Sequence, residues 1–398
     1  MICVGIDAAS MKHDVCIAND KGVQFGKVFT IKNTKDDYEK LLGRIQAAKE
    51  YFNDADVRLG IESTGSYSAV LTEYLAGRDG LEVILINPIL TNRYQQIRKV
   101  HYAKTDTIDA AGIAAYVASN PNVRTYTPPS YHLRALKEMY RDLVTLNKNI
   151  TESKNKLKAA LHRYFPEYLS VFSCVSSKAS LCILMEYRDP RRLLKRKPET
   201  IRRSVNGKSG GHRTIKKAQE LQQAVKNTVG NRQNYSGIVL KNIAERIVLF
   251  QKQKEELVSS RKPLVEEEAP ELLTIPGIST ILAAGIISEI ISIANFQNAD
   301  QLVAYAGLDP IVYESGTYKA RNTRISKKGS AYLRDALYYA SFCVSQRDEV
   351  FHAYYQKKIS EGKKHRVVLG HISKKLCRLI FRLLTTHKGY VPRPVGKK

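Results

Sequence analysis

Two apolar, β-branched stretches in the first part of the chain each end on a carboxylate. The first ends at Asp7, and the second, which begins at residue 57, ends at Glu62. Asp106 and Asp109 follow in an alanine-rich stretch, and their spacing places them on one face of a helix. Singly, an Asp at a strand end is typical of a turn, and one at a helix start is favoured by the helix dipole. Together the four favour a metal site, because an unpaired buried carboxylate is costly and a divalent cation pairs with it.

Such a set of carboxylates suits the cleavage of a phosphodiester. Two Mg²⁺ ions about 3.5–4 Å apart activate the attacking oxygen and stabilise the leaving oxygen. Mg²⁺ prefers oxygen ligands, and four carboxylates balance the charge of two ions. We therefore expect Asp7, Glu62, Asp106 and Asp109 to form one catalytic tetrad that binds two Mg²⁺ ions.

Residue periodicity predicts an α/β domain that carries these carboxylates. It indicates strands at 1–9, 14–18, 23–29, 57–61 and 81–86, and helices at 36–52, 66–75, 94–100 and 104–116. Three strands, a helix, a strand, a helix, a strand and a closing helical segment match a ribonuclease-H-like fold. In this arrangement the carboxylates lie on the first and fourth strands and on the last helix.

The basic excess of the chain lies entirely after residue 125. The formal net charge is +26, yet residues 1–125 hold 15 basic and 15 acidic side chains. Residues 126–265 hold 29 and 11, and residues 266–398 hold 20 and 12. A solvated basic surface is the simplest explanation, but a surplus confined to two regions also raises the affinity for nucleic acid through counterion release. We expect a polyanion partner for these two regions.

Two heptad patterns in the second region predict long helices with coiled-coil seams. The first runs from residue 136 to 164 and the second from 240 to 264, with Asn147 and Lys254 among their polar seam positions. The pair can form an antiparallel hairpin within one chain or a dimer between chains. We favour the dimer.

The segment between the two seams, residues 166–239, is very basic. We expect it to be an irregular insertion that faces RNA, with Arg191, Arg192 and Arg196 among its nucleic-acid contacts. The division predicted from the sequence is therefore a nuclease domain at 1–125, a coiled-coil domain at 126–265 that includes this insertion, and a mainly helical domain at 266–398.

The last region contains a second group of chemical interest. Ser315 precedes a glycine and then a series of cations, namely Lys319, Arg321, Arg324, Lys327 and Lys328. Serine becomes a nucleophile when its proton is removed, and cations stabilise the charge that develops on an attacked phosphate. The alternative to a catalytic serine is that Ser315 and Gly316 form a turn without a chemical role. Upstream, residues 272–291 resemble a helix-hairpin-helix, in which a Pro-Gly turn meets a phosphate, and a plain turn between packed helices is the alternative.

The order of these motifs resembles one family over nearly the whole chain. The matching stretches are 5–7, 61–65, 104–110, 275–278, 305–308, 315–316 and 324–329. The family is that of bridge-RNA-guided insertion-sequence transposases and recombinases, with an N-terminal RuvC-like DEDD domain, a coiled coil and a C-terminal serine-bearing domain.

This resemblance implies a set of roles and partners. The tetrad would be the family's acidic site, and Ser315 its nucleophile, which forms a covalent phosphoserine link to DNA. The implied partners are donor DNA, target DNA, a guide (bridge) RNA and a second copy of the chain, with a tetramer assembling on DNA. The implied location is the bacterial cytoplasm, at the nucleoid.

Three other classes of protein share part of these features. A RuvC-like junction nuclease needs only the tetrad and leaves Ser315 and its cations unexplained. An RNA-binding scaffold accounts for the charge but not for the carboxylates. A sugar-kinase-like ATPase shares the strand that ends at Asp7, but it needs a second glycine-rich phosphate loop, which we do not find.

Composition excludes several other classes. No apolar run reaches the length of a membrane span and the start does not read as a signal peptide, so we expect a soluble intracellular protein without a membrane partner. The six cysteines form no C-x-x-C pair, which argues against zinc and a disulfide framework and predicts buried thiols.

Overall fold

The computed structural model describes residues 1–63, 67–98, 106–123, 125–188, 190–209, 214–230, 236–311, 314–315, 318–319 and 324–392. Two compact units make up the chain, Met1–Pro128 and Pro129–Lys398. None of the helices in these ranges combines the length and apolar character needed to cross a membrane.

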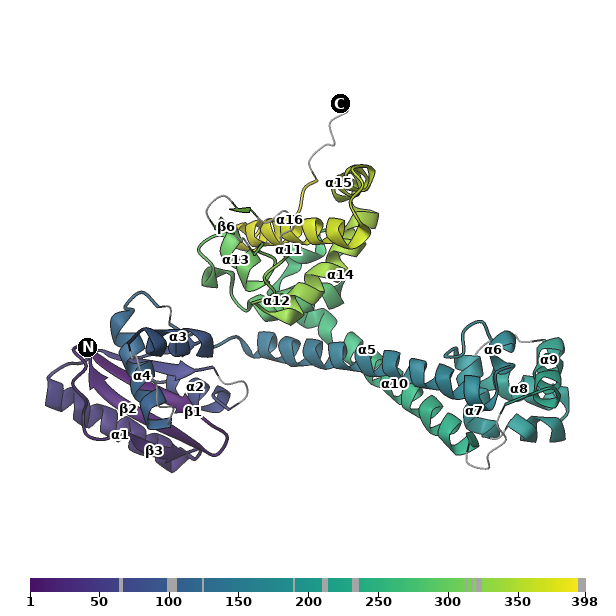
Figure 1. The fold of residues 1–398 in the computed structure, drawn as a ribbon, viewed down its shortest axis with the longest axis horizontal. Helices are drawn as coiled ribbons and strands as arrows, with labels where there is room; N and C mark the ends of the chain where they lie inside the picture. Colours follow the sequence, from purple (N-terminus) through teal and green to yellow (C-terminus); the bar gives the residue numbers. More distant parts are fainter. Residues whose placement is uncertain are drawn as a thin grey trace. The chain divides into compact units, whose positions relative to one another are not determined.

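The first unit is built on a mixed five-stranded sheet in the order β3-β2-β1-β4-β5 (Figure 1). β1 pairs antiparallel with β2 and parallel with β4, and β4 pairs parallel with β5. This arrangement confirms the predicted α/β class of the N-terminal domain. The strands are β1 (Ile2–Ala8), β2 (Lys12–Asn19), β3 (Phe29–Lys32), β4 (Val57–Glu62) and β5 (Leu81–Ile86).

Helices cover both faces of this sheet. α1 (Lys35–Phe52) and α2 (Ala69–Ala76) bury one face through a core that includes Val4 and Ile6. α4 (Asp106–Ser119) packs on the other face over β1, β2 and β4, and α3 (Pro88–Arg98) packs beside α4. β1 is therefore covered on both sides, which explains its continuous apolar sequence.

Two predicted elements of this unit are displaced. The strand expected at 23–29 is wrong in position, because β3 begins only at Phe29. Gly26 has φ of 72° and interrupts the extended backbone of that segment. The helix expected from residue 94 begins at Pro88, whose fixed φ suits the first turn of a helix.

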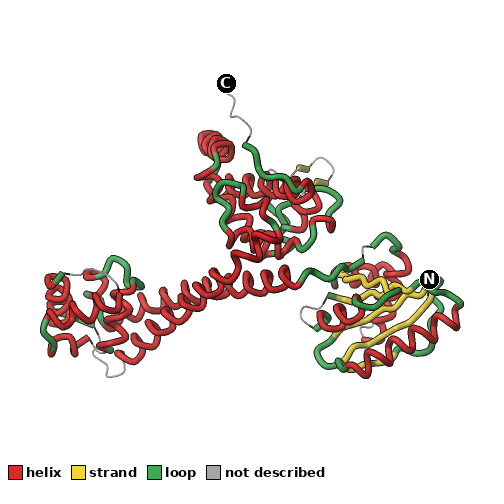
Figure 2. The backbone as a smooth tube through the Cα atoms, turned by 180° about the vertical axis from the view of Figure 1, so that it is seen from behind, coloured by secondary structure: helices red, strands yellow, loops and turns green. Residues whose placement is uncertain are grey.

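The second unit contains two long helices that pack side by side, α5 (Tyr131–Tyr164) and α10 (Ser236–Glu268) (Figure 2). They run antiparallel, because Ser130 bonds to Glu268 at 2.6 Å while Lys254 donates to the Asn147 side chain at 2.8 Å. The hairpin alternative therefore holds for these helices within the chain, and two polar seam residues pair with each other. The dimer stays a prediction.

The insertion at 166–239 is not irregular, and that prediction is wrong. Short helices fill its described part and share a core with the ends of the long pair, with Leu184 and Leu221 among the buried side chains. The longer of these helices bury apolar residues at helical spacing, which the frequent cations obscure in the sequence. The elements are α6 (Tyr168–Val171), α7 (Lys178–Tyr187), η1 (Pro190–Lys195), α8 (Pro198–Ser209) and α9 (Ile215–Lys226).

The rest of the second unit is mainly helical and shares its core with the start of α5. The elements are α11 (Pro270–Leu273), α12 (Thr280–Ile290), η2 (Ile293–Asn295), α13 (Ala299–Tyr305), β6 (Glu314–Ser315), β7 (Tyr318–Lys319), α14 (Ala331–Arg347), α15 (Glu349–Ser360) and α16 (His365–Thr386).

The Pro-Gly turn before α12 packs against protein. Gly277 has φ of 100°, and a Cβ there would lie 2.8 Å from the Cys343 carbonyl group in α14. This packing favours the plain turn between helices over a helix-hairpin-helix phosphate contact.

The predicted burial of the thiols holds only in part. Cys3, Cys16 and Cys377 are buried, whereas Cys174 is exposed. Burial raises the pKa of Cys3 and Cys16 to about 11, so these two thiols are core residues rather than nucleophiles.

Candidate active site

The ends of β1 and β4 bring two of the predicted carboxylates onto neighbouring strands. The parallel register pairs Gly5 with Gly60 and Ile6 with Ile61. Asp7 and Glu62 come next on their strands, and each lies two residues beyond a glycine that faces α4. Since side chains alternate between the faces of a sheet, both half-buried carboxylates are on the α4 face.

The two glycines let α4 approach the sheet closely. A Cβ on Gly5 would lie 2.1 Å from the Ala110 carbonyl oxygen, and one on Gly60 would lie 2.5 Å from Val117. Along β1, Cys3 packs near Val117 and Gly5 near Ala110, so α4 runs antiparallel to the strand. The first turn of α4 therefore lies toward the end of the sheet that carries Asp7.

This orientation places Asp106 and Asp109 of α4 near the same end of the sheet as Asp7. Asp109 precedes Ala110 and is half-buried, and Asp106 is the first residue of α4. The side chain of Asp106 lies outside the described part of the structure. Three of the four predicted tetrad residues thus have described side chains, and the packing of β1, β4 and α4 brings them to one end of the sheet.

Two polar neighbours of this acidic end are not anticipated by the sequence patterns. Asp14 pairs with Asp7 across the β1–β2 ladder and is only 7% exposed, and its carboxylate accepts a hydrogen bond from the Thr30 hydroxyl at 2.5 Å. Thr91 of α3 is buried and donates to Glu62 at 3.1 Å. The predicted pairing of the first two strands is a signal that could have found Asp14, whereas no sequence signal points to Thr91.

The donor set suits a hard divalent cation. Asp7, Glu62 and Asp109 offer only carboxylate oxygens, the ligand type that Mg²⁺ prefers. Among the side chains that the structure describes, no three of His, Cys, Asp or Glu gather closely enough to hold a metal ion. Asp106, whose side chain is not described, would be the additional ligand.

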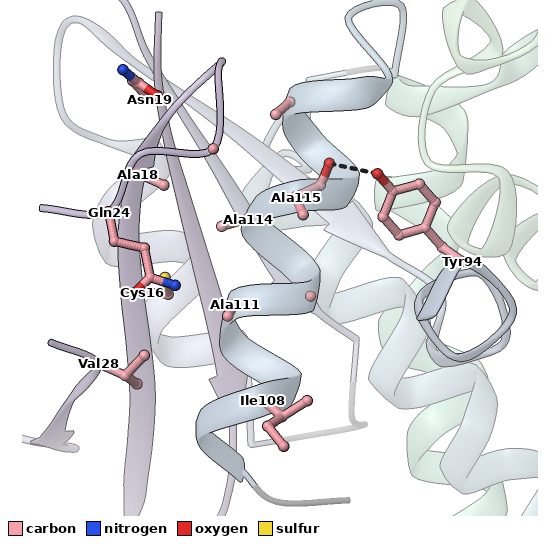
Figure 3. Close-up of a pocket in the computed structure, with 13 residues that line it drawn as sticks. Cys16, Ala18, Asn19, Gln24, Val28, Tyr94, Ile108, Ala111, Ala114 and Ala115 are labelled. Carbon is pink, nitrogen blue, oxygen red and sulfur yellow. Dashed lines mark hydrogen bonds between the residues drawn. The ribbon is translucent and has the colours of Figure 1, made fainter. Parts of the chain in front are cut away.

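A cavity of about 620 Å³ runs along α4, between this helix and β2 (Figure 3). Its wall consists mainly of small side chains such as Ala111 and Ala114, and the Tyr94 hydroxyl at its edge donates to the Ala115 carbonyl at 3.1 Å. The lining reaches Ile108 but includes none of the described tetrad side chains. The cavity is therefore not the acidic site.

Ser315 lies in a short hairpin of the second unit. β6 and β7 pair antiparallel, with Glu314 opposite Lys319 and Ser315 opposite Tyr318. Ser315 is the last residue of β6, and β7 begins at Tyr318. The side chains of Ser315 and Lys319 and the whole of Arg321 lie outside the described residues.

Polar contacts join the two ends of the segment that carries this hairpin. Ile311 N–H donates to the Arg324 carbonyl at 2.8 Å, and the Ser326 hydroxyl donates to the Asp309 carboxylate at 2.5 Å. The backbone of Lys327 has a φ of 54°, in the left-handed region that residues other than glycine rarely adopt. Arg324, Lys327 and Lys328 are exposed. The segment thus presents cations on a backbone that is tied at its base.

An ion pair between buried Glu289 and half-exposed Arg141 supports the base of this segment. Glu289 of α12 is 1% exposed and accepts two hydrogen bonds from Arg141 of α5, at 2.8 and 3.2 Å. It also accepts from the Ser330 hydroxyl at 2.9 Å, which in turn caps α14. The hydrogen bond to Glu289 raises the pKa of Arg141, and burial lowers the pKa of Lys137 on the same helix. Sequence reasoning missed this network, because Arg141 and Glu289 are 148 residues apart and Ser330 is 41 residues from Glu289.

The predicted cations of the insertion lie on its surface. Arg191, Arg192 and Arg196 are exposed on and after η1. Gln222 of α9 donates to the Leu193 and Arg196 carbonyls at 2.8 and 2.7 Å and so fixes this turn. A rigid cationic turn can contact phosphates.

Two family models match successive parts of the chain. A DEDD transposase model of the IS110 group, described as "Transposase", matches residues 4–166. A second model, described as "Transposase IS116/IS110/IS902 family", matches residues 269–356. The first match spans the acidic end of the sheet and the second spans the Ser315 hairpin.

Relatives align over almost the full length. A protein of insertion element IS116 from Streptomyces clavuligerus is 22% identical over 99% of this chain and 97% of its own. The pilin gene-inverting protein of Moraxella bovis is 22% identical over 98% of both chains. Among solved structures, T. thermophilus RuvC in complex with Holliday junction substrate has 15% identity and a TM-score of 0.24, covering 32% of this chain and 99% of that chain. Since both family models describe the same transposases and the relatives align from end to end, the chain belongs to the IS116/IS110/IS902 family of DNA transposases and recombinases.

Proposed function

We propose that this transposase is an RNA-guided DNA recombinase whose RuvC-like acidic tetrad and Ser315 together cut and rejoin strands. The observation that carries the proposal is the packing of α4 across β1 and β4, which brings Asp7, Glu62 and Asp109 to one end of the sheet. A metal-dependent nuclease needs carboxylates that share one end of a sheet in this way. The three described carboxylates do not by themselves gather closely enough to hold an ion, so Asp106 would complete the set.

The tetrad residues would bind divalent cations, with Mg²⁺ as the expected metal. A bound pair of such cations neutralises charge on the scissile phosphate and lowers the barrier to its attack. The chain's own part is to hold the carboxylates in place. Thr91 orients Glu62 by its hydrogen bond, and the close approach of α4 at Gly5 fixes the height of Asp109 above the strand.

Ser315 would act as the nucleophile. Its Oγ loses its proton and forms a bond to phosphorus, the bond from phosphorus to one deoxyribose oxygen breaks, and that oxygen takes up a proton and leaves as a hydroxyl, so the step consumes no net proton. The product is a phosphoserine diester, and attack by a second DNA hydroxyl reverses the step and joins a new strand. Arg324, Lys327 and Lys328 are exposed cations near the hairpin in sequence and suit the charge of the phosphate.

The guide RNA would bind the basic insertion. Its support is the excess of 29 basic over 11 acidic side chains at residues 126–265, together with exposed Arg191, Arg192 and Arg196 on a fixed turn. Binding of this kind depends steeply on salt, because each neutralised phosphate releases counterions.

The complete site would form between protomers. Asp7 and Ser315 belong to different compact units of the chain, so a dimer can join the tetrad of one copy to the serine of another. Tetramers on DNA follow from pairing two such dimers.

Two substitutions test the chemistry. With guide RNA, DNA and Mg²⁺, Asp7→Asn should abolish cleavage while RNA binding survives. Ser315→Ala should abolish the covalent protein–DNA adduct, which is detected as a band that resists denaturant and nuclease trimming. Cleavage at the wild-type rate by Asp7→Asn would refute the metal assignment. Cleavage without any adduct in the wild type would favour a junction nuclease.

A further inference from the structure

A cationic groove with an aromatic wall lies on the C-terminal part of the chain, in a region that the proposed chemistry does not use. Its volume is about 420 Å³, and its lining comes from α15, α16 and residues 390–391. No acidic side chain lines it among the residues that the structure describes.

The charge of this groove comes from one face of α16. That helix holds five Lys and Arg side chains and no Asp or Glu. Lys375, Arg378 and Arg382 line the groove, and their spacing of three and four residues places them in one exposed row. Asp300 of α13 pairs with Arg378 at 2.7 Å, which fixes the middle of the row and leaves the charges at its two ends in excess.

An aromatic ring stands beside these cations. The Lys375 ammonium lies 4.6 Å from the centre of the Tyr354 ring, and the Lys358 ammonium lies 5.7 Å from it. Tyr390 and Val391 form another part of the lining. The Tyr390 N–H donates to the Thr274 hydroxyl at 2.7 Å, which ties this segment to the domain. The groove therefore has a fixed wall on the side of Tyr390.

We propose that this groove binds single-stranded DNA. One base stacks on the Tyr354 ring in place of the Lys375 ammonium that lies over it, and neighbouring phosphates bind Lys375 and Arg382. Aromatic rings between cations are the recognition elements of unpaired strands, because a free base offers its face to a ring while the backbone follows the charge. A duplex hides those faces. The proposal commits to DNA because α13 packs on α16 and leads directly into the segment of Ser315, so it rests on the proposed function for the identity of the strand.

The absence of tryptophan from the chain gives a site-specific probe. Tyr354→Trp would carry the single indole of the protein, and stacking of a base quenches indole fluorescence. The full chain with Ser315→Ala, without Mg²⁺, is titrated with a twelve-nucleotide oligo-dT. We expect emission to fall by about half, and the apparent Kd to rise about tenfold when Lys375→Ala and Arg382→Ala are added.

Matched controls separate this groove from general binding to a basic protein. Tyr51→Trp places the indole at an exposed site in the neutral first unit, and its emission should not change. Equal quenching at both sites, or no quenching at Tyr354→Trp, would overturn the proposal, as would stronger quenching by oligo-U or by a duplex. If Tyr354→Trp fails to fold, Tyr390→Trp on the other part of the lining gives the same readout. Because the titration involves no cleavage, failure here leaves the tetrad and Ser315 untouched, and loss of cleavage leaves the groove intact.

Discussion

The acidic end of the sheet and the Ser315 hairpin are held in place by opposite means. At the acidic end, apolar packing fixes the structure. β1 is covered on both faces, and Gly5 lets the α4 backbone contact the strand. At the hairpin, polar contacts fix the structure, through the Asp309–Ser326 bond and the ion pair of buried Glu289 with half-exposed Arg141. Residues 1–125, which carry the acidic end, have no net formal charge, whereas residues 266–398, which carry the hairpin, are basic.

This difference indicates what each region tolerates. Metal ligands need fixed positions, and a packed core supplies them. The serine that is proposed to join and leave DNA lies in a segment whose two ends are fixed by polar contacts. We therefore expect steric changes to damage the acidic end most, and the loss of single polar groups to damage the hairpin region most.

The largest effect should follow Gly5→Val. The new side chain would meet the Ala110 carbonyl oxygen and the Ala114 nitrogen, both backbone atoms that cannot rotate away. Separation of α4 from β1 should lower the free energy of unfolding by at least about 3 kcal/mol and abolish Mg²⁺-dependent cleavage. Urea denaturation followed by circular dichroism measures the first effect.

Gly43→Ala is the matched control. Gly43 lies on α1, and a Cβ there meets no atom within 4 Å. The change should stabilise the protein by about 0.5–1 kcal/mol, because alanine favours a helix. If Gly5→Val were as well tolerated as Gly43→Ala, the close contact between α4 and β1 would not be required.

A smaller loss should follow Arg141→Ala. It leaves the buried Glu289 carboxylate with one fewer charged partner, and the half-exposed position of Arg141 reduces the cost. We expect on the order of 2 kcal/mol less stability and fewer Ser315–DNA adducts per molecule, while RNA affinity stays unchanged.

Lys241→Ala serves for comparison. It breaks a more exposed pair with Glu245 one helical turn away, so the loss should stay below about 0.5 kcal/mol. Equal losses for the two variants would contradict a special role of the Glu289 network.

The smallest effect should come from Asp335→Asn and should depend on pH. Burial raises the pKa of Asp335 above its ordinary 3.8, so the folded protein keeps this proton to higher pH than the unfolded chain does. Stability then falls as pH rises through that window, and Asp335→Asn should remove the loss. The variant should have a slightly higher Tm at pH 7, and the gain should shrink toward pH 4.

Asp300→Asn should behave in the opposite way. The Arg378 hydrogen bond lowers the pKa of Asp300, so the carboxylate form favours the folded state above about pH 4. This variant should have a slightly lower Tm at pH 7. A gain in Tm for both variants would show that the two carboxylates do not differ as their surroundings imply.

The sequence predicts the first region well for a physical reason. Strand alternation, turn residues and the spacing of Asp106 and Asp109 are local signals, and they indicate every strand of the sheet except the position of β3. The pairing of Asn147 with Lys254 and of Arg141 with Glu289 depends on how distant helices meet. No local pattern encodes such contacts. In the insertion, frequent charged side chains interrupt the apolar spacing by which its helices would be predicted.

The proposed site joins these two regions, and it can form either between protomers or within one chain. A heterodimer of an Asp7→Asn chain with a Ser315→Ala chain separates the possibilities. If sites are shared, one is intact and the other is doubly defective. If each chain builds its own site, every site lacks one residue.

The decisive measurement is the covalent adduct on guide RNA and DNA, with the two chains distinguished by mass. The account predicts that each variant alone gives no adduct, and that the mixture gives a Ser315–DNA adduct on the Asp7→Asn chain together with single-strand cleavage. If heterodimers form on RNA and DNA and yet neither cleavage nor adduct returns, the shared site is contradicted.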